Sequence, residues 1–309
     1  MELKMSRTIH LLAFLGTLSL LSCNKTVEPC GQQDNVTLSL CASCPTKTRN
    51  EDVMNSLDLL VFSSEDGVLL SRSRSESDIV SCEIPRGRKV SFYVMANAPE
   101  GEFADVDEIS DLASKEVEFC DSDLFFSSAE GEHKFDKDTA LEIGLTRLES
   151  KITVESLSAD LLGQEEFTGS TVIMEKIFLT GLADRCGWSL RPVLPDGSAT
   201  VANWKTSKVM NIKLESSTSN VVESLYCFPN PGQSGHCTSV VAQLSIDGIV
   251  TYYPIEIPEM KCNTEYVIRN IRIKGWGSDD PSTPVEREVI GYSIALRPWT
   301  ESSKEVDFN

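Results

Sequence analysis

Histidine is scarce in this sequence, with three residues in a chain of 309. Because imidazole is the commonest acid–base group and metal ligand near neutral pH, this scarcity disfavours an enzyme. Basic residues are also few: 28 Lys and Arg stand against 47 Asp and Glu, which gives a net charge of −19. So acidic a chain lacks the cationic surface that holds nucleic-acid phosphates, and an anionic bilayer repels it. We therefore expect no nucleic-acid partner.

Long apolar runs are also rare. Residues 9–21 form one, but it is shorter than the ~20 residues of a membrane-spanning helix. It follows Lys4 and Arg7 and ends at Ser22 and Cys23, as a secretory leader does, so residues 1–22 are predicted to be a signal peptide. Its last residues resemble the lipobox of bacterial lipoproteins, which implies that Cys23 carries a lipid such as palmitate. An ordinary signal peptide with a chance cysteine is the alternative.

Cysteine is present in an odd number once Cys23 is set aside. The nine that remain cannot all pair within one chain. Cys41 and Cys44 have the spacing of a metal knuckle, but Cys30 is the only further cysteine nearby, and a structural zinc site needs a second pair. We therefore interpret these cysteines as thiols in the core or in loops, and we predict no metal site.

Helical periodicity is almost absent, and residues 106–117 form the one predicted helix. Strand-like runs recur instead, about every ten to fifteen residues. They are residues 36–40, 57–62, 68–70, 89–95, 151–154, 171–179, 240–246, 250–253, 266–273, 289–296 and 305–308. Asp247 and Gly248 between two of them indicate a hairpin. Two series of strands predict an all-β chain of two sandwiches, at residues 23–147 and 148–309, with a boundary near 142–150.

No arrangement of residues typical of catalysis is found. His133 and His236 lie in polar loop sequences, and the pairing of His236 with Ser234 or Cys237 lacks the glycines of a nucleophile elbow. Asp279 and its neighbour Asp280 lack the alternating spacing of a calcium loop. Phosphate-binding and dinucleotide-binding fingerprints are missing too. We predict that the protein is not an enzyme and binds no cofactor.

Eight sequence features, individually weak, occur in one order along the chain. They are the lipobox at Cys23, the strand 57–62 with its acidic-glycine turn, and residues 94–99, 145–152, 225–230, 246–255, 273–281 and 289–299. Together they resemble the fimbrillins, subunits of the type V fimbriae of Bacteroidales bacteria. The resemblance implies two tandem transthyretin-like β-sandwich domains, whereas the nine additional cysteines depart from the family.

The resemblance also implies how subunits join. They are exported as lipoproteins, and a trypsin-like protease cuts after a basic residue, which removes the first strand and opens a groove for a neighbour's strand. In this chain the first strand is residues 36–41, whose alternation turns Val36, Leu38 and Leu40 toward the core. Lys47 and Arg49 follow in a polar linker and are the candidate cleavage sites, although a surface loop can be basic by chance.

Residues 289–308 are the candidate donor strand. Ile290, Tyr292, Ile294 and Leu296 alternate as a groove requires, and a resident edge strand has the same pattern. The implied protein is a pilus subunit at the outer membrane or in the fimbria, on the extracellular face. It polymerises with other subunits and supports adhesion to a host or bacterial surface.

Two alternatives remain open at this point. One is an anchor lipoprotein of the same system, which keeps its first strand and its lipid in the outer membrane. The other is a surface lipoprotein that binds glycans, which needs an exposed aromatic platform. The four tryptophans, Trp188, Trp204, Trp276 and Trp299, are scattered along the chain.

Overall fold

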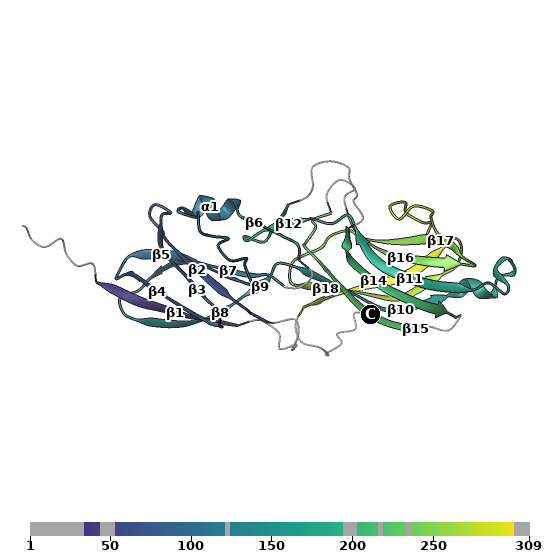
Figure 1. Cartoon of the computed structure of the whole chain (residues 1–309), viewed down its shortest axis with the longest axis horizontal. Helices are drawn as coiled ribbons and strands as arrows, with labels where there is room; N and C mark the ends of the chain where they lie inside the picture. Colours follow the sequence, from purple (N-terminus) through teal and green to yellow (C-terminus); the bar gives the residue numbers. More distant parts are fainter. Residues whose placement is uncertain are drawn as a thin grey trace, which may run out of the picture. The chain divides into compact units, whose positions relative to one another are not determined.

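The computed structural model describes residues 34–43, 53–120, 124–193, 203–215, 219–232 and 237–299 (Figure 1). Most of this part is β-strand. Its helical elements are α1 (Ile109–Ser114) and the 3₁₀ turns η1 (Asp160–Gly163) and η2 (Glu165–Phe167). None of the helices in these ranges has the length and apolar character to cross a membrane. The prediction of an all-β chain is confirmed.

The first half of the chain forms a β-sandwich. Its strands are β1 (Asn35–Ser43), β2 (Leu57–Ser63), β3 (Leu69–Ser75), β4 (Ile79–Pro85), β5 (Lys89–Ala96), β7 (Phe126–Lys134), β8 (Thr139–Gly144) and β9 (Thr146–Arg147). A three-stranded sheet, β4-β1-β8, packs on a five-stranded sheet, β3-β2-β5-β7-β9. Leu38, Leu59 and Phe92 are among the fully buried side chains between the two sheets.

The second half forms another sandwich. Its strands are β10 (Ser150–Ala159), β11 (Val172–Thr180), β14 (Asn203–Leu214), β15 (Ser219–Cys227), β16 (Thr238–Ile246), β17 (Ile249–Ile257), β18 (Thr264–Ile273) and β19 (Ile290–Pro298). The sheets are β15-β10-β18-β19 and β14-β11-β16-β17. Ile152, Met174 and Ile268 belong to the core between them. The two-sandwich architecture predicted from the strand series is confirmed.

The two sandwiches repeat one strand order. β4-β1-β8 in the first corresponds to β15-β10-β18 in the second, and β3-β2-β5-β7 corresponds to β14-β11-β16-β17. Orientation agrees as well: β1 is antiparallel to β4 and parallel to β8, as β10 is to β15 and β18. β18 carries an additional strand, β19, at its edge, whereas β8 carries none in the described chain.

A third apolar layer covers the outer face of β2. The short strands β6 (Glu116–Glu118), β12 (Arg185–Gly187) and β13 (Arg191–Val193) form a small sheet there. Between this small sheet and β2 lies a separate apolar core, in which Leu60 and Phe62 of β2 pack with Trp188 and Phe228. Because both of its faces are covered, every residue of β2 is buried.

Local sequence explains the hairpin but not the helix. Asp247 and Gly248 have φ of 51° and 86°, the paired left-handed conformation that a two-residue hairpin requires, and they join β16 to β17 as predicted. The helix predicted over residues 106–117 is shorter. It ends at Ser114 because the chain then extends to pair β6 with β12, a partner distant in sequence. The strand predicted at residues 305–308 lies outside the described residues.

Candidate functional site

Strand β1 fills a slot in the middle of a sheet. From Asn35 to Cys41 it pairs antiparallel with β4, and from Leu38 to Ser43 it pairs in parallel with β8 (Figure 1). Val36, Leu38 and Leu40 are 3%, 0% and 0% exposed, as their alternation predicted. A strand held on both edges and along one face occupies a groove, and without it β4 and β8 would each have an unpaired inner edge.

Polar contacts hold the outer face of β1. The amide of Thr37 donates to the Asp138 carboxylate over 2.8 Å, and the hydroxyls of Ser39 and Ser81 lie 2.8 Å apart. Opposite Leu38 on β4 is Cys82, whose buried thiol faces the core. Burial raises the pKa of the Cys82 thiol to about 11, so it stays protonated and acts as a small apolar side chain.

Three predicted site residues lie outside the described residues. They are Cys23, the candidate lipidation site, and Lys47 and Arg49, the candidate cleavage sites. Their roles stay predictions. The described chain resumes at Val53, so the linker that carries Lys47 and Arg49 joins β1 to β2.

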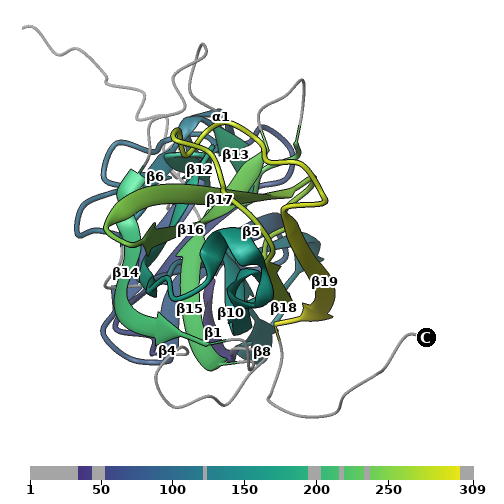
Figure 2. The ribbon, with the colours of Figure 1, turned by 90° about the vertical axis from the view of Figure 1, so that its right-hand side faces the viewer.

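The predicted donor segment is a resident edge strand of its own sheet. β19 pairs antiparallel with β18 and lies at the margin of the second sandwich (Figure 2). Ile290 is buried and Ile294 packs against the core, whereas Tyr292 and Leu296 are 43% and 59% exposed. Of the two structures compatible with the alternation, the resident strand is the one observed.

The end of β19 is held by an ion pair. Both carboxylate oxygens of buried Glu265 accept hydrogen bonds from Arg297, at 2.7 and 2.9 Å, and Thr153 donates a third at 2.6 Å. Burial by itself raises the pKa of Glu265, but the bonds from Arg297 and Thr153 outweigh burial and hold this pKa below its usual value. Glu265 therefore ties β19 to β18 in its ionised form.

Trp299 anchors the chain directly after β19. Its ring is buried, stacks on Tyr226 at 5.5 Å and lies 4.5 Å from the guanidinium carbon of Arg147. Arg147 also donates to the Trp299 carbonyl over 3.2 Å. β19 is thus fixed at both ends, through Ile290 and through Trp299.

Two charged residues of the 145–152 segment are fully buried, which the sequence pattern did not reveal. Arg147 donates to Asn263, and Glu149 accepts the amide of Phe125 at 2.9 Å. The second carboxylate oxygen of Glu149 is buried and has no hydrogen bond from the residues that the structure describes. Burial raises the pKa of Glu149 to about 8, so the side chain is mostly protonated at neutral pH. Charged residues in a linker between strand series usually face solvent, so sequence alone gave no signal.

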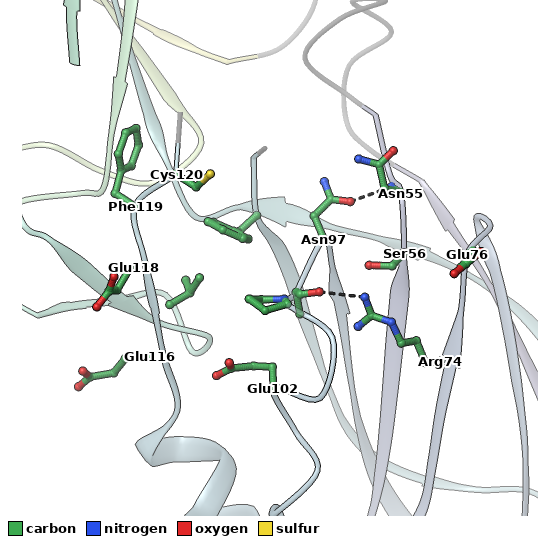
Figure 3. Close-up of a pocket in the computed structure, with 14 residues that line it drawn as sticks. Asn55, Ser56, Arg74, Glu76, Asn97, Glu102, Glu116, Glu118, Phe119 and Cys120 are labelled. Atoms are coloured by element: carbon green, nitrogen blue, oxygen red, sulfur yellow. Dashed lines mark hydrogen bonds between the residues drawn. The ribbon is translucent and has the colours of Figure 1, made fainter. Parts of the chain in front are cut away.

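A cavity of about 660 Å³ opens beside the start of β2 and strand β6 (Figure 3). Its lining includes Glu76, Glu102, Glu116 and Glu118. Arg74 is engaged elsewhere: it donates to Asp58 at 2.6 Å and to the Ala98 carbonyl at 3.0 Å. With four carboxylates against one engaged guanidinium, the cavity does not suit an anionic ligand such as a phosphate.

Of the two histidines considered for catalysis, His133 is the one that lies in the described part of the chain. His133 packs between Phe92 and Phe135, and its Nε2 lies 3.7 Å from the Glu130 carboxylate. His236 lies outside the described residues. Within the described ranges, no group of three or more His, Cys, Asp or Glu is placed to hold a metal.

Comparison with known proteins gives a structural likeness. No family model matches the sequence, and neither does any curated protein. Among solved structures, a proposed cell adhesion protein from Bacteroides eggerthii has a TM-score of 0.60 at 18% identity, over 88% of this chain and 98% of that one. One from Parabacteroides distasonis has a TM-score of 0.63 at 14% identity, over 88% and 99%.

A fimbrilin from Porphyromonas gingivalis is also similar. Its TM-score is 0.59 at 12% identity, over 87% of this chain and 99% of that one. At these identities the likeness establishes the fold. The chain thus has the β-sandwich fold of fimbrial and proposed cell adhesion proteins of Bacteroidales bacteria, in line with the resemblance noted from its sequence.

Proposed function

We propose that the protein is a structural subunit of a surface fimbria, joined to its neighbours by exchange of strand β1. The observation that carries this proposal is the place of β1: it is the first strand of the described chain, yet it lies between β4 and β8. A single cut in the linker after Ser43 would leave β1 held by non-covalent contacts alone. The likeness to a fimbrilin structure supports the same function.

The groove offers enough free energy for a durable junction. Three large apolar side chains, Val36, Leu38 and Leu40, are buried on β1 beside the small Ala42. Each of the three contributes about 1.5–3 kcal/mol. A donor strand that replaces them, and restores main-chain hydrogen bonds on both edges, gives a junction on the order of 5–10 kcal/mol. This gain is available to offset the cost of releasing the donor strand from its own sheet.

Processing and export remain the parts of the proposal that rest on sequence. We propose lipidation at Cys23, which would hold the precursor at the outer membrane, and cleavage after Arg49 or Lys47. The donor would be β19 of a neighbouring copy, with Ile290, Tyr292, Ile294 and Leu296 as the alternating set. To serve as donor, β19 has to leave β18 and break the Arg297–Glu265 ion pair.

The test is a pair of double variants expressed in a bacterium that assembles such fimbriae. Lys47→Ala with Arg49→Ala removes both cleavage sites, and we expect a lipid-anchored monomer that retains β1. Arg86→Ala with Lys137→Ala, at exposed turn positions, is the matched control and should polymerise like the wild type. Polymers of normal length from the first variant would refute the proposal.

N-terminal sequencing of surface material separates a subunit from an anchor. Asn50 or Thr48 as the first residue, for a cut after Arg49 or Lys47, indicates a processed subunit. A lipid-modified Cys23 in the surface-exposed polymer indicates the anchor lipoprotein, and it contradicts removal of β1.

The described tryptophans do not favour a glycan-binding function. Trp188 and Trp299 are buried. Trp276 is 39% exposed, but its ring packs on Phe167 and its indole N–H donates to Glu166 at 3.0 Å. No two of these three rings form an open platform on which a sugar could stack, so the fimbrial proposal is preferred.

A further inference from the structure

The cavity of about 660 Å³ beside β2 and β6 has an apolar wall (Figure 3). Val117, Phe119 and Phe125 contribute to this wall, and all three side chains are buried. The volume lies within the ~300–1,000 Å³ of small-molecule sites. The lining residues belong to the first half of the chain, and none of them lies on β4 or β8. A ligand could therefore bind in the cavity independently of strand exchange.

A buried hydroxyl faces this cavity. Ser56 directly precedes β2 and is 5% exposed. Its backbone carbonyl accepts the amide of Asn97 at 3.0 Å. Its hydroxyl points into the cavity (Figure 3) and forms no hydrogen bond with the described residues. Buried polar groups are almost always hydrogen-bonded, so an exception that faces a cavity indicates a place for a polar atom of a ligand.

The cations near the cavity are engaged with other carboxylates. These ion pairs are Arg74–Asp58, Lys115–Asp105 and Arg185–Glu116, with N–O distances of 2.6, 2.7 and 2.8 Å. Glu76, Glu102 and Glu118 also line the cavity, and they form no ion pair with the described residues. The electrostatic potential in the cavity is therefore negative, which favours a positively charged ligand.

Glu102 is the carboxylate that gains most from such a ligand. It is half-buried, and its side chain extends from the turn after β5 toward β6 (Figure 3). Burial raises the pKa of Glu102, and the charge of Lys115 offsets only part of this rise. A cation inside the cavity would stabilise the ionised form of Glu102, because a charge-assisted hydrogen bond compensates for lost hydration.

We propose that this cavity binds an aliphatic cation, that is, an ammonium or guanidinium group on a hydrocarbon stem. The charged group pairs with the carboxylate of Glu102, and a ligand N–H donates to the hydroxyl oxygen of Ser56. The stem lies along the apolar wall beside Val117. A sugar fits less well, because the rings of Phe119 and Phe125 are buried and present no open face for stacking.

The test uses the mature chain, residues 23–309, with Cys23→Ser to prevent lipidation. Two probes carry the same guanidinium and stem: agmatine is a free cation, and N-acetyl-arginine amide presents the side chain of a peptide. Titrations followed by saturation-transfer NMR at low salt should show weak binding that added salt reduces. N-acetyl-norleucine amide, which has a similar stem and no charge, should bind about tenfold more weakly.

Two variants of equal net charge separate the cavity from the acidic surface as a whole. Glu102→Gln should weaken binding of the probes about tenfold. Glu142→Gln, at an exposed position of β8, is the matched control and should bind them like its parent. Ser56→Ala leaves the charge unchanged and should weaken binding about threefold. Circular dichroism and thermal unfolding verify that each variant is folded.

The two probes also identify the source of the cation. If N-acetyl-arginine amide binds with this pattern, the cavity accepts an arginine side chain of a peptide; if agmatine alone does, it accepts a free cation. Failure of both probes to bind would overturn the proposal. So would equal weakening by Glu102→Gln and Glu142→Gln, because that result indicates attraction by net charge alone. None of these measurements requires cleavage of the chain, so their outcome is independent of the fimbrial proposal.

Discussion

Truncation of Leu38 tests whether β1 is a true part of the core. This side chain is fully buried between Cys82 on β4 and Thr139 on β8, with the facing sheet above it. Replacing leucine by alanine removes its apolar contacts and leaves a cavity, which costs about 2–5 kcal/mol in protein cores. β1 is bound on both edges and cannot collapse into the cavity. We therefore expect Leu38→Ala to lower the free energy of unfolding by about 3–5 kcal/mol, in the upper half of that range.

Thr37→Ala is the control on the same strand. Thr37 is exposed on the opposite face, and its contact with Asp138 uses the backbone amide, which alanine retains. We expect it to cost less than about 1 kcal/mol. Both variants are measured by urea unfolding of the uncleaved mature chain, followed by far-ultraviolet circular dichroism and tryptophan fluorescence.

The comparison has a clear refuting outcome. If Leu38→Ala costs no more than Thr37→Ala, β1 does not fill a groove, and its removal could not create a binding site for a neighbour. If the predicted loss is found, a donor strand must restore a comparable free energy, which can be measured by adding a synthetic peptide of residues 289–299 to cleaved protein.

Other predictions concern buried ionisable groups. The folded-state pKa of Glu149, about 8, lies above its ordinary 4.5, so the stability that Glu149 contributes is greatest below pH 4.5 and declines, by on the order of 4 kcal/mol, up to pH 8. The difference between the urea midpoints of the wild type and Glu149→Gln should follow this decline. The pKa of Glu265 is lowered instead, so its contribution is present at neutral pH and is lost as pH falls below its ordinary value. Arg297→Ala should cost about 1–3 kcal/mol at pH 7 and less in acid, by the same assay. The buried thiols of Cys82 and Cys227 should resist maleimide labelling at pH 8 until the chain unfolds, and rapid labelling, read by mass spectrometry, would contradict their burial.

Strand identity and the inward face of β1 could be read from the sequence. Alternation with a period of two is a local property, so Val36, Leu38 and Leu40 could be assigned to the core without knowledge of their partners. The hairpin at Asp247 was equally local, because two left-handed residues define the turn. The signal peptide, Cys23 and the linker around Arg49 were also read from local patterns, and they stay predictions.

Pairing between distant segments was decided by the tertiary structure alone. β1 lies between strands that begin at Ile79 and Thr139, and no local pattern encodes which edges meet. For the same reason the helix ended early at Ser114, and Glu149 was found buried. The alternation of residues 290–296 fitted both a donor and a resident strand, and packing against β18 settled its place. Sequence determined which side of each strand is apolar; long-range pairing determined which strand each one meets.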